Sequence, residues 1–440
     1  MSRRSIVIVV GALALLLALT PFIPRGDDDG SLVPSGDGKV GALRPADTAG
    51  FSAVTPAMQA EIDRVVAAGR SLGRVSGKAS PEQLAASLVR CADLDGQRYC
   101  LGAGWTEDTE AQVRSRVSTA ARMAARSAGT VENTGDLSPE AALLREARMS
   151  PATRAAADRA ELTMAARSVA KVWLLRHQIE GVPLPADFLA NHPEARAAVP
   201  VARKTSTPNT AMPTPTKSPT KSPTKAPTSS PTRTPTQPSA SATKSAVKPM
   251  SAYPPRSAIL DPKDVAAQTR TYWCGPTSMQ MIVWGWRHKR QPQGWWAKRL
   301  HTTTSGTSIN DMARVVNQST GWDKQSHAGP YIVLDIGHYS FSQWMLLMMR
   351  HIHDYKAPVV LHPILLKRFY PYLDDDASGH FQVGRGYAKL GKKPDVLGYF
   401  EPWNQQRFDP SEPYIDRVQW RDAYKSYRAN ETHYAHNVGV

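Results

Sequence analysis

Cys274 lies at the start of a predicted helix, a position in which a cysteine side chain can act as a nucleophile. It opens the stretch CGPTSMQMIVWGW, in which Pro276 suits the first turn of a helix and apolar residues recur at helical spacing. The start of a helix offers free backbone N–H groups and the positive end of the helix dipole, which stabilise a thiolate and lower its pKa from about 8.5. Cys274 is therefore a candidate nucleophile. The alternative is a cysteine that only fills space in the core.

A thiolate that attacks a carbonyl group needs a base and hydrogen-bond donors for the developing oxyanion. Gln268 lies six residues before Cys274, where its amide can join a backbone N–H as a donor. His380 lies in SGHFQVGRGY, after a polar turn and at the start of a predicted strand. Glu401 ends the next predicted strand, and a carboxylate there can orient the imidazole. Each also has a structural interpretation: a loop cap, a surface histidine and a charge at a strand end.

The elements that carry these residues belong to the part of the chain from 251 to 440. Helical spacing predicts helices over 275–287, 308–318 and 340–354, and shorter apolar runs predict strands over 357–364, 380–387 and 396–401. Helices followed by strands are typical of an α+β domain with an antiparallel sheet. We expect this domain to hold the chemistry.

Residues 51–200 have a different character, rich in Ala, Arg and Leu. Their spacing predicts helices over 55–72, 81–91, 108–128, 138–148 and 151–180. Ser80-Pro81 and Ser138-Pro139 are typical helix starts, with serine as the N-cap and proline in the first turn. We expect a small all-α domain of unknown role, because nothing in it forms a catalytic constellation.

The chain has three cysteines, and two of them are close in sequence. Cys91 and Cys100 flank a segment with the turn dipeptide Asp95-Gly96, so their side chains can meet. We predict that they form a disulfide. Cys274 is then the unpaired thiol of the chain.

The N-terminus and a central segment predict export and a spacer. Two arginines precede an apolar run of 14 residues from 6 to 19, which suits a secretory signal, although an uncleaved anchor stays open. We therefore divide the start of the chain into a signal peptide or anchor (1–25) and a disordered stretch (26–50). Residues 201–250 form a Thr/Pro/Lys-rich linker in which proline recurs every fourth residue, which favours an extended chain.

The formal net charge of +16 does not require a nucleic-acid partner. The linker 201–250 carries 8 basic and no acidic residues, which is half of the excess. A basic spacer can instead contact an anionic cell wall or membrane surface. We expect no nucleic acid, cofactor or metal ion as a partner.

Three motifs together resemble the C39-like cysteine peptidases: QTRTYWCGPTSMQMI, GHFQVGRGY and YFEP, within about 255–410. The resemblance implies a papain-like fold, with Cys274 as nucleophile, His380 as general base and Gln268 as oxyanion donor. The family usually carries Asp or Asn where this chain has Glu401. Two nearby aspartates, Asp395 and Asp409, are therefore alternatives for the residue that orients the histidine.

The resemblance implies an exported or surface-anchored bacterial peptidase that hydrolyses amide bonds in a protein or peptide substrate, without a cofactor. One alternative is a hydrolase of peptidoglycan stem peptides, and another is a catalytically silent binding module at the cell surface. The helical domain could also be a pro-segment that cleavage of the linker releases. The sequence leaves the substrate specificity and the oligomeric state open.

Overall fold

The computed structural model describes residues 50–440 except 74, 75, 77, 128, 199–247, 323–326, 328, 404 and 409–413. The predicted signal segment (1–25), nearly all of the stretch predicted to be disordered (26–50) and most of the predicted linker (201–250) lie outside the described residues. None of the helices in the described ranges is long and apolar enough to cross a membrane.

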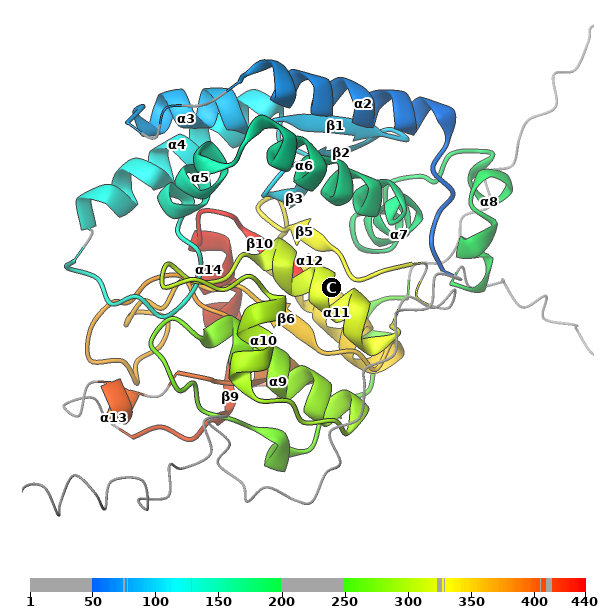
Figure 1. Ribbon diagram of the computed structural model, residues 1–440. Helices are drawn as coiled ribbons and strands as arrows, with labels where there is room; N and C mark the ends of the chain where they lie inside the picture. Colours follow the sequence, from blue (N-terminus) through cyan, green and yellow to red (C-terminus); the bar gives the residue numbers. More distant parts are fainter. Residues whose placement is uncertain are drawn as a thin grey trace, which may run out of the picture.

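A ten-stranded sheet passes through both halves of the described chain (Figure 1). Its strands lie in the order β1-β2-β3-β5-β10-β6-β7-β8-β9, and β4 pairs with β7. The pairings between these strands are antiparallel, except that β3 runs parallel to β5. The strands are β1 (Cys91–Leu94), β2 (Gln97–Cys100), β3 (Gly104–Trp105), β4 (Arg256–Ala258), β5 (Val333–Asp335), β6 (Val359–Leu361), β7 (Gln382–Ala388), β8 (Val396–Phe400), β9 (Val418–Asp422) and β10 (Asn437–Gly439).

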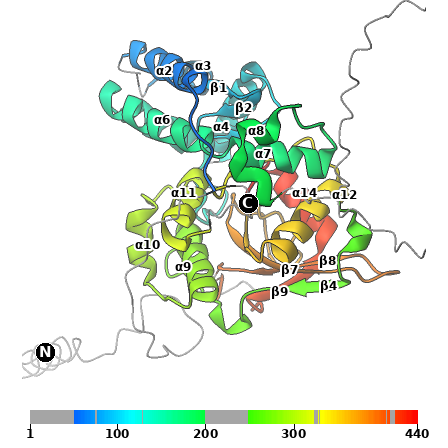
Figure 2. The same ribbon diagram turned by 90° about the vertical axis from the view of Figure 1, so that its right-hand side faces the viewer.

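Helices cover the two faces of this sheet. The described helices are α2 (Pro56–Ser71), α3 (Pro81–Leu88), α4 (Glu110–Ser127), α5 (Pro139–Arg148), α6 (Pro151–Ala166), α7 (Val169–Leu175), α8 (Phe188–Asn191), α9 (Cys274–Arg287), α10 (Gln293–Arg299), α11 (Ile309–Thr320), α12 (Phe341–Met349), α13 (Gln405–Phe408) and α14 (Ala423–Thr432). The helices α9, α10 and α11 form one core with the sheet, whereas α12 and α14 join a second core with α2, α6 and α7 (Figure 2).

The short strand β6 contributes side chains to both hydrophobic cores, one on each face of the sheet. Val359 and Leu361 pack into the core with α12, and Val360 between them packs into the core with α9. Successive side chains of a strand point to opposite faces, so three consecutive apolar residues mark a strand buried on both sides. The strand therefore runs through the middle of the domain.

Most predicted helices are confirmed. The helices α2, α4, α5, α9 and α11 begin and end within two residues of the predicted bounds. The predicted helix 151–180 is interrupted: α6 ends at Ala166, α7 follows, and a π-helical turn closes the segment at Arg176–Glu180. A similar π-helical turn, Arg350–Asp354, ends the predicted helix 340–354.

The prediction that residues 51–200 are all-α needs a correction, because β1, β2 and β3 lie among the helices. Asp95 and Gly96 both have positive φ, +50° and +75°, which is the conformation of a two-residue hairpin turn. Cys91 pairs with Cys100 in the hairpin, and the two residues form the predicted disulfide. Strands of four residues and fewer are too short for an alternating pattern to reveal them.

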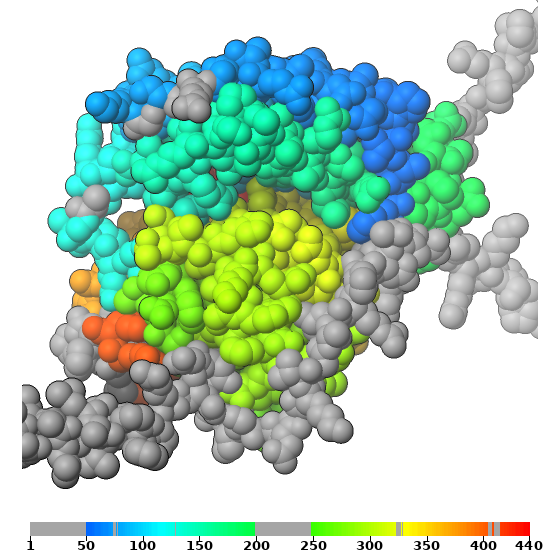
Figure 3. Space-filling view, in the orientation of Figure 1, coloured from blue at the N-terminus to red at the C-terminus, as the bar shows by residue number. Residues whose placement is uncertain are grey.

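The two halves of the described chain are joined by more than the sheet. Lys171 of α7 is buried and donates hydrogen bonds to the carbonyl groups of Pro330 (3.1 Å) and Val440 (2.6 Å). Its ammonium group lies 3.9 Å from the centre of the Trp322 ring. In the space-filling view the atoms of the N-terminal half lie directly against those of the C-terminal half (Figure 3). Residues 50–198 are thus packed as part of one body with residues 248–440.

Candidate active site

Cys274 is the first residue of α9 and is fully buried. The helix packs its apolar face against strands of the central sheet, which fixes the position of its first turn. The Cys274 thiol makes hydrogen bonds with the backbone of Gly275, next in the helix, and of Phe381, from the strand side of the domain. The cysteine therefore lies where the start of α9 meets the segment just before β7.

His380 is the residue before Phe381 and is also fully buried. Its Nε2 lies 2.7 Å from Oε1 of Glu401, the residue that follows β8. Because β7 and β8 are neighbours in the sheet, the histidine and the carboxylate come from adjacent strand ends. Nδ1 of His380 has no hydrogen-bond partner among the described residues. With Nε2 held by Glu401, Nδ1 is the nitrogen left to exchange a proton.

Glu401 is held by four donors. Oε1 accepts from His380 and from the backbone N–H of Trp403 (3.0 Å), and Oε2 accepts from Gln382 (2.7 Å) and from the hydroxyl of Tyr372 (2.9 Å). Burial opposes ionisation of this carboxyl, but attraction to His380 and these hydrogen bonds bring the pKa of Glu401 below its usual value. The longer side chain of Glu401 thus reaches the imidazole as an ionised acceptor.

Of the two aspartates considered as alternatives, Asp395 does not replace Glu401. Asp395 lies at the other end of β8, where its carboxylate accepts from the backbone N–H of Leu390 at 3.2 Å. Asp409 lies outside the described residues.

Gln268 is buried at the base of the same region, and its backbone N–H donates to the carbonyl of Pro402. Its side-chain nitrogen contacts the carbonyl groups of Thr271 (2.7 Å), Arg270 (3.1 Å) and Thr134 (3.4 Å). The first two belong to the loop that leads into Cys274. Thr134 comes from the N-terminal half of the chain, between α4 and α5.

The pKa of Cys274 differs from the expectation. Burial raises the pKa of this thiol well above its usual value, and the charges of Asp136 and Glu401 act in the same direction, so that the backbone hydrogen bonds do not offset them. The helix start is present as predicted, but the thiol is excluded from water. Burial therefore favours the protonated form of Cys274.

A second group of titratable residues lies next to the site and was not found in the sequence. His362 and His433 contact the two oxygens of Asp136 at 2.9 and 3.1 Å through their Nε2 atoms. All three side chains are buried, and the His362 ring stacks on Phe381, the residue after His380. The three residues are distant in sequence and share no local motif, so only the folded chain brings them together.

These three residues form a poor metal site, although their ligand atoms lie within 4.8 Å of one another. Nδ1 of His433 accepts a hydrogen bond from the backbone N–H of Ala435 at 3.1 Å. Nε2 of His433 then carries the proton and donates to Asp136, whereas a metal ligand needs a free electron pair there. The group is better described as a hydrogen-bonded carboxylate between two imidazoles.

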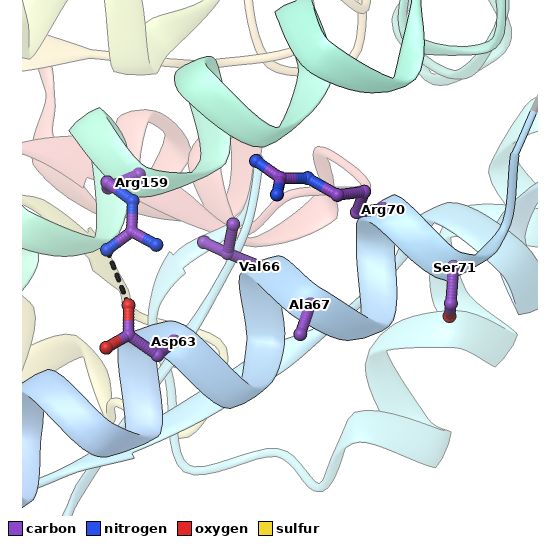
Figure 4. A pocket seen from close by; sticks show the side chains of 6 residues that line it. All are labelled: Asp63, Val66, Ala67, Arg70, Ser71 and Arg159. Carbon is purple, nitrogen blue, oxygen red and sulfur yellow. Dashed lines mark hydrogen bonds and ion pairs between the residues drawn. The ribbon is translucent and has the colours of Figure 1, made fainter.

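A groove of about 310 Å³ lies far from these residues, between α2 and α6 (Figure 4). Asp63 and Arg159 form an ion pair of 2.6 Å at its side, and both side chains are exposed. The polar side chains that line the groove are all exposed, so we do not regard it as a site of chemistry.

A buried thiol at a helix start contacts the backbone of Phe381, and the preceding residue is a histidine that a carboxylate holds. These are the elements of a thiol-dependent hydrolase. Residues 262–432 match the model of the Peptidase_C39 like family. The matched range includes Gln268, Cys274, His380 and Glu401. The C-terminal half of this mixed α/β chain is therefore C39-like, and the match supports a peptidase. A search of curated proteins and a search of solved structures returned no match.

Proposed function

We propose that this protein is an exported cysteine peptidase that hydrolyses amide bonds. Cys274 is the nucleophile, His380 the general base and Glu401 the residue that orients the imidazole. Gln268, together with the backbone N–H of Cys274, holds the oxyanion. The observation that carries the proposal is the buried contact of 2.7 Å between His380 Nε2 and Glu401, which leaves Nδ1 for the thiol.

The reaction follows from these positions. Nδ1 of His380 takes the proton of the Cys274 thiol, and the sulfur attacks the carbonyl carbon of the substrate. The tetrahedral intermediate collapses when the imidazolium gives its proton to the leaving amine, which leaves a thioester on Cys274. His380 then takes a proton from water, which attacks the thioester and releases the acid. Atoms and protons balance without a metal ion or a cofactor.

Two features support an exported enzyme rather than a silent binding module. The Cys91–Cys100 disulfide is typical of a protein in an oxidising compartment. Glu401, the departure from the family pattern, makes the contact with His380 that an orienting residue needs. Four donors hold that carboxylate in its ionised form, which is the form that orients an imidazole.

The test is hydrolysis of a peptide mixture by the full chain with its disulfide oxidised, with products identified by mass spectrometry. The assay uses the unaltered chain and a Gly135→Ala variant. Gly135 belongs to the N-terminal half, and a Cβ added there would meet Cys274 Sγ at 2.9 Å and the backbone of Tyr272 at 2.7 Å, so the chain beside the thiol must shift. We expect cleavage that disappears in Cys274→Ala and falls at least tenfold in Glu401→Gln, with KM nearly unchanged.

Purified cell walls in a parallel turbidity assay separate the two classes of substrate. Loss of turbidity without cleavage of the peptide mixture would assign the activity to peptidoglycan stem peptides. The proposed function is wrong if no cleavage of the peptide mixture or of the cell walls, by the unaltered chain or by Gly135→Ala, depends on Cys274.

A further inference from the structure

The thiol is covered by a segment from the N-terminal half of the chain, residues 131–137 (VENTGDL), which we call the strap. In Figure 1 the chain between α4 and α5 leaves the N-terminal half, runs onto the C-terminal half and returns. The first residues of the strap are partly exposed, whereas Thr134, Gly135, Asp136 and Leu137 are buried. The strap belongs to the region before the linker, outside the range that matches the family model.

Hydrogen bonds of the strap backbone hold it between two walls of the site. On one side the N–H of Ser378 donates to the carbonyl of Glu132 (2.9 Å), and the N–H of Asp136 donates to the carbonyl of Gly379 (3.3 Å). On the other side Thr307 donates to the carbonyl of Gly135 and accepts from the N–H of Leu137, both at 2.9 Å. The strap forms isolated β-bridges on both sides, at 132 with 377 and at 136 with 307. An extended peptide bound through its backbone is held in this way.

The middle of the strap meets the residues proposed for catalysis. The Thr134 carbonyl lies 3.4 Å from the side-chain nitrogen of Gln268, the expected oxyanion donor. The next residue, Gly135, approaches so closely that an added Cβ would meet Cys274 Sγ at 2.9 Å and the backbone of Tyr272 at 2.7 Å. A backbone carbonyl at the oxyanion donor and a Cα against the nucleophile are the positions that a substrate peptide would take.

Asp136 fastens the strap at this point. Its carboxylate lies between His362 (2.9 Å) and His433 (3.1 Å), both in the C-terminal half. An added Cβ at Gly379, the residue before His380, would meet Asp136 Oδ2 at 2.4 Å, so the carboxylate also packs against the chain that carries the histidine. A buried carboxylate with two imidazole partners gives the strap a specific anchor rather than a general apolar contact.

We propose that the strap occupies the place of a substrate chain and holds the enzyme in a latent form, in which Cys274 is sealed until the strap is displaced. This inference rests on the proposed function of Cys274. It also narrows the idea of a pro-segment to the strap. The N-terminal half shares a sheet and a core with the C-terminal half, whereas the strap is a loop between α4 and α5. The turn before it, at Gly129 and Thr130, is exposed and accessible to a protease or a partner.

The test is the rate at which a small alkylating reagent labels Cys274 in the full, folded chain. Cys274 is the single free thiol, so the label is unambiguous. The variant Gly135→Ala forces the strap away, and the matched control is Gly129→Ala. Both glycines have positive φ, +114° and +82°, but a Cβ at Gly129 meets nothing within 4 Å. We expect slow labelling of the unaltered chain and of Gly129→Ala, and labelling at least tenfold faster for Gly135→Ala.

Urea at concentrations below the unfolding transition separates opening of the strap from global unfolding. Labelling through the strap should change little with urea, since little surface is exposed, whereas labelling through unfolding rises steeply. If Gly135→Ala does not fold, Asp136→Asn replaces it, with the exposed Asp63→Asn as its control. Equal labelling of the variant and its control, or fast labelling of the unaltered chain, would overturn the inference.

The same samples distinguish this inference from the proposed function. In the Gly135→Ala chain before labelling, a further His380→Ala change should shift the pH profile of alkylation if the histidine activates the thiol. Faster labelling with no effect of His380→Ala would keep the strap as a cover but reject the catalytic role of the pair.

Discussion

Asp136 is the charged residue that anchors the strap. Burial opposes its ionisation, but attraction to His362 and hydrogen bonds from His362 and His433 lower the pKa of Asp136 from 3.8 to about 2. The folded chain therefore releases this proton more readily than the unfolded chain. The stability that Asp136 contributes is present above pH 3.8 and is lost as pH falls toward 2.

We expect Asp136→Asn to lower the free energy of unfolding at pH 7 by roughly 2–4 kcal/mol, because it removes the charged partner of two buried imidazoles. The dependence of stability on pH between 2 and 4 should become weaker than in the unaltered chain. Urea unfolding at pH 3 and pH 7 measures both effects. Asp63→Asn, at an exposed ion pair, should leave stability unchanged. A variant as stable as the unaltered chain at pH 7 would show that the histidines do not anchor the strap.

The hairpin of β1 and β2 is the element that the disulfide closes. The bridge spans a sequence separation of 9 residues, for which loss of chain entropy gives about 2–3 kcal/mol. Residual structure in the reduced, unfolded chain lowers the measured gain, so the smaller value is expected.

The double change Cys91→Ala and Cys100→Ala should therefore lower the free energy of unfolding by about 2 kcal/mol. Thermal unfolding of the variant, and of the unaltered chain with and without reductant, measures this. Labelling of Cys274 under native conditions should not change, because the bridge lies in the hairpin and not among the residues that cover the thiol. Equal melting temperatures would contradict a stabilising bridge.

Helix α6 presents Glu161 to both halves of the molecule. Its carboxylate accepts from the Tyr99 hydroxyl (3.0 Å), the Gly102 N–H (2.8 Å) and the side-chain amide of Asn310 in α11 (2.9 Å). Burial raises the pKa of Glu161 from 4.5 to about 7. Because the folded chain keeps this proton longer than the unfolded chain, stability falls as pH rises from 4.5 to about 7.

Glu161→Gln should weaken that decrease, since the amide can still accept a hydrogen bond but cannot ionise. Part of the decrease will persist, because burial also raises the pKa of Glu146 to about 7. Melting temperatures from pH 5 to pH 8 test the prediction. A variant whose melting temperature follows that of the unaltered chain across this range would show that Glu161 does not titrate there.

At the level of the whole molecule, the two halves should stay together after the linker is cut. They share the ten-stranded sheet and one apolar core, and Lys171 of the N-terminal half binds the carbonyl groups of Pro330 and Val440. Separation of the halves would expose that core to water, at a free-energy cost of about 25 cal/mol for each Å² of apolar surface.

A protease site inserted within residues 201–247 provides the measurement. After complete cleavage we expect both fragments to elute together in size-exclusion chromatography and to separate only in denaturant. Cys274 should remain protected from alkylation in the cut complex. Separation in native buffer would restore the interpretation of the N-terminal half as a removable pro-segment.

Local sequence predicted the parts of the site that lie in recognisable motifs. Cys274 is at a helix start because a proline suited to the first turn follows it. His380 precedes one apolar run and Glu401 follows the next, so both lie at the ends of neighbouring strands. The predicted helices agree well with the structure for the same reason, since helical spacing is visible within one element. The strands β1, β2 and β3 were missed because each is four residues or fewer and none lies in an apolar run such as the one that predicted β6.

The sequence by itself therefore determined the helix that carries the thiol, the disulfide pair and the reaction class to which the motifs point. It could not reveal that Thr134, Gly135 and Asp136 cover that thiol, or that Asp136 meets His362 and His433. Such contacts arise between segments far apart in the chain, and their free energy depends on which surfaces folding brings together. A helix start lowers the pKa of a thiol, but burial by a distant segment outweighs it, and only the packed chain shows which effect prevails.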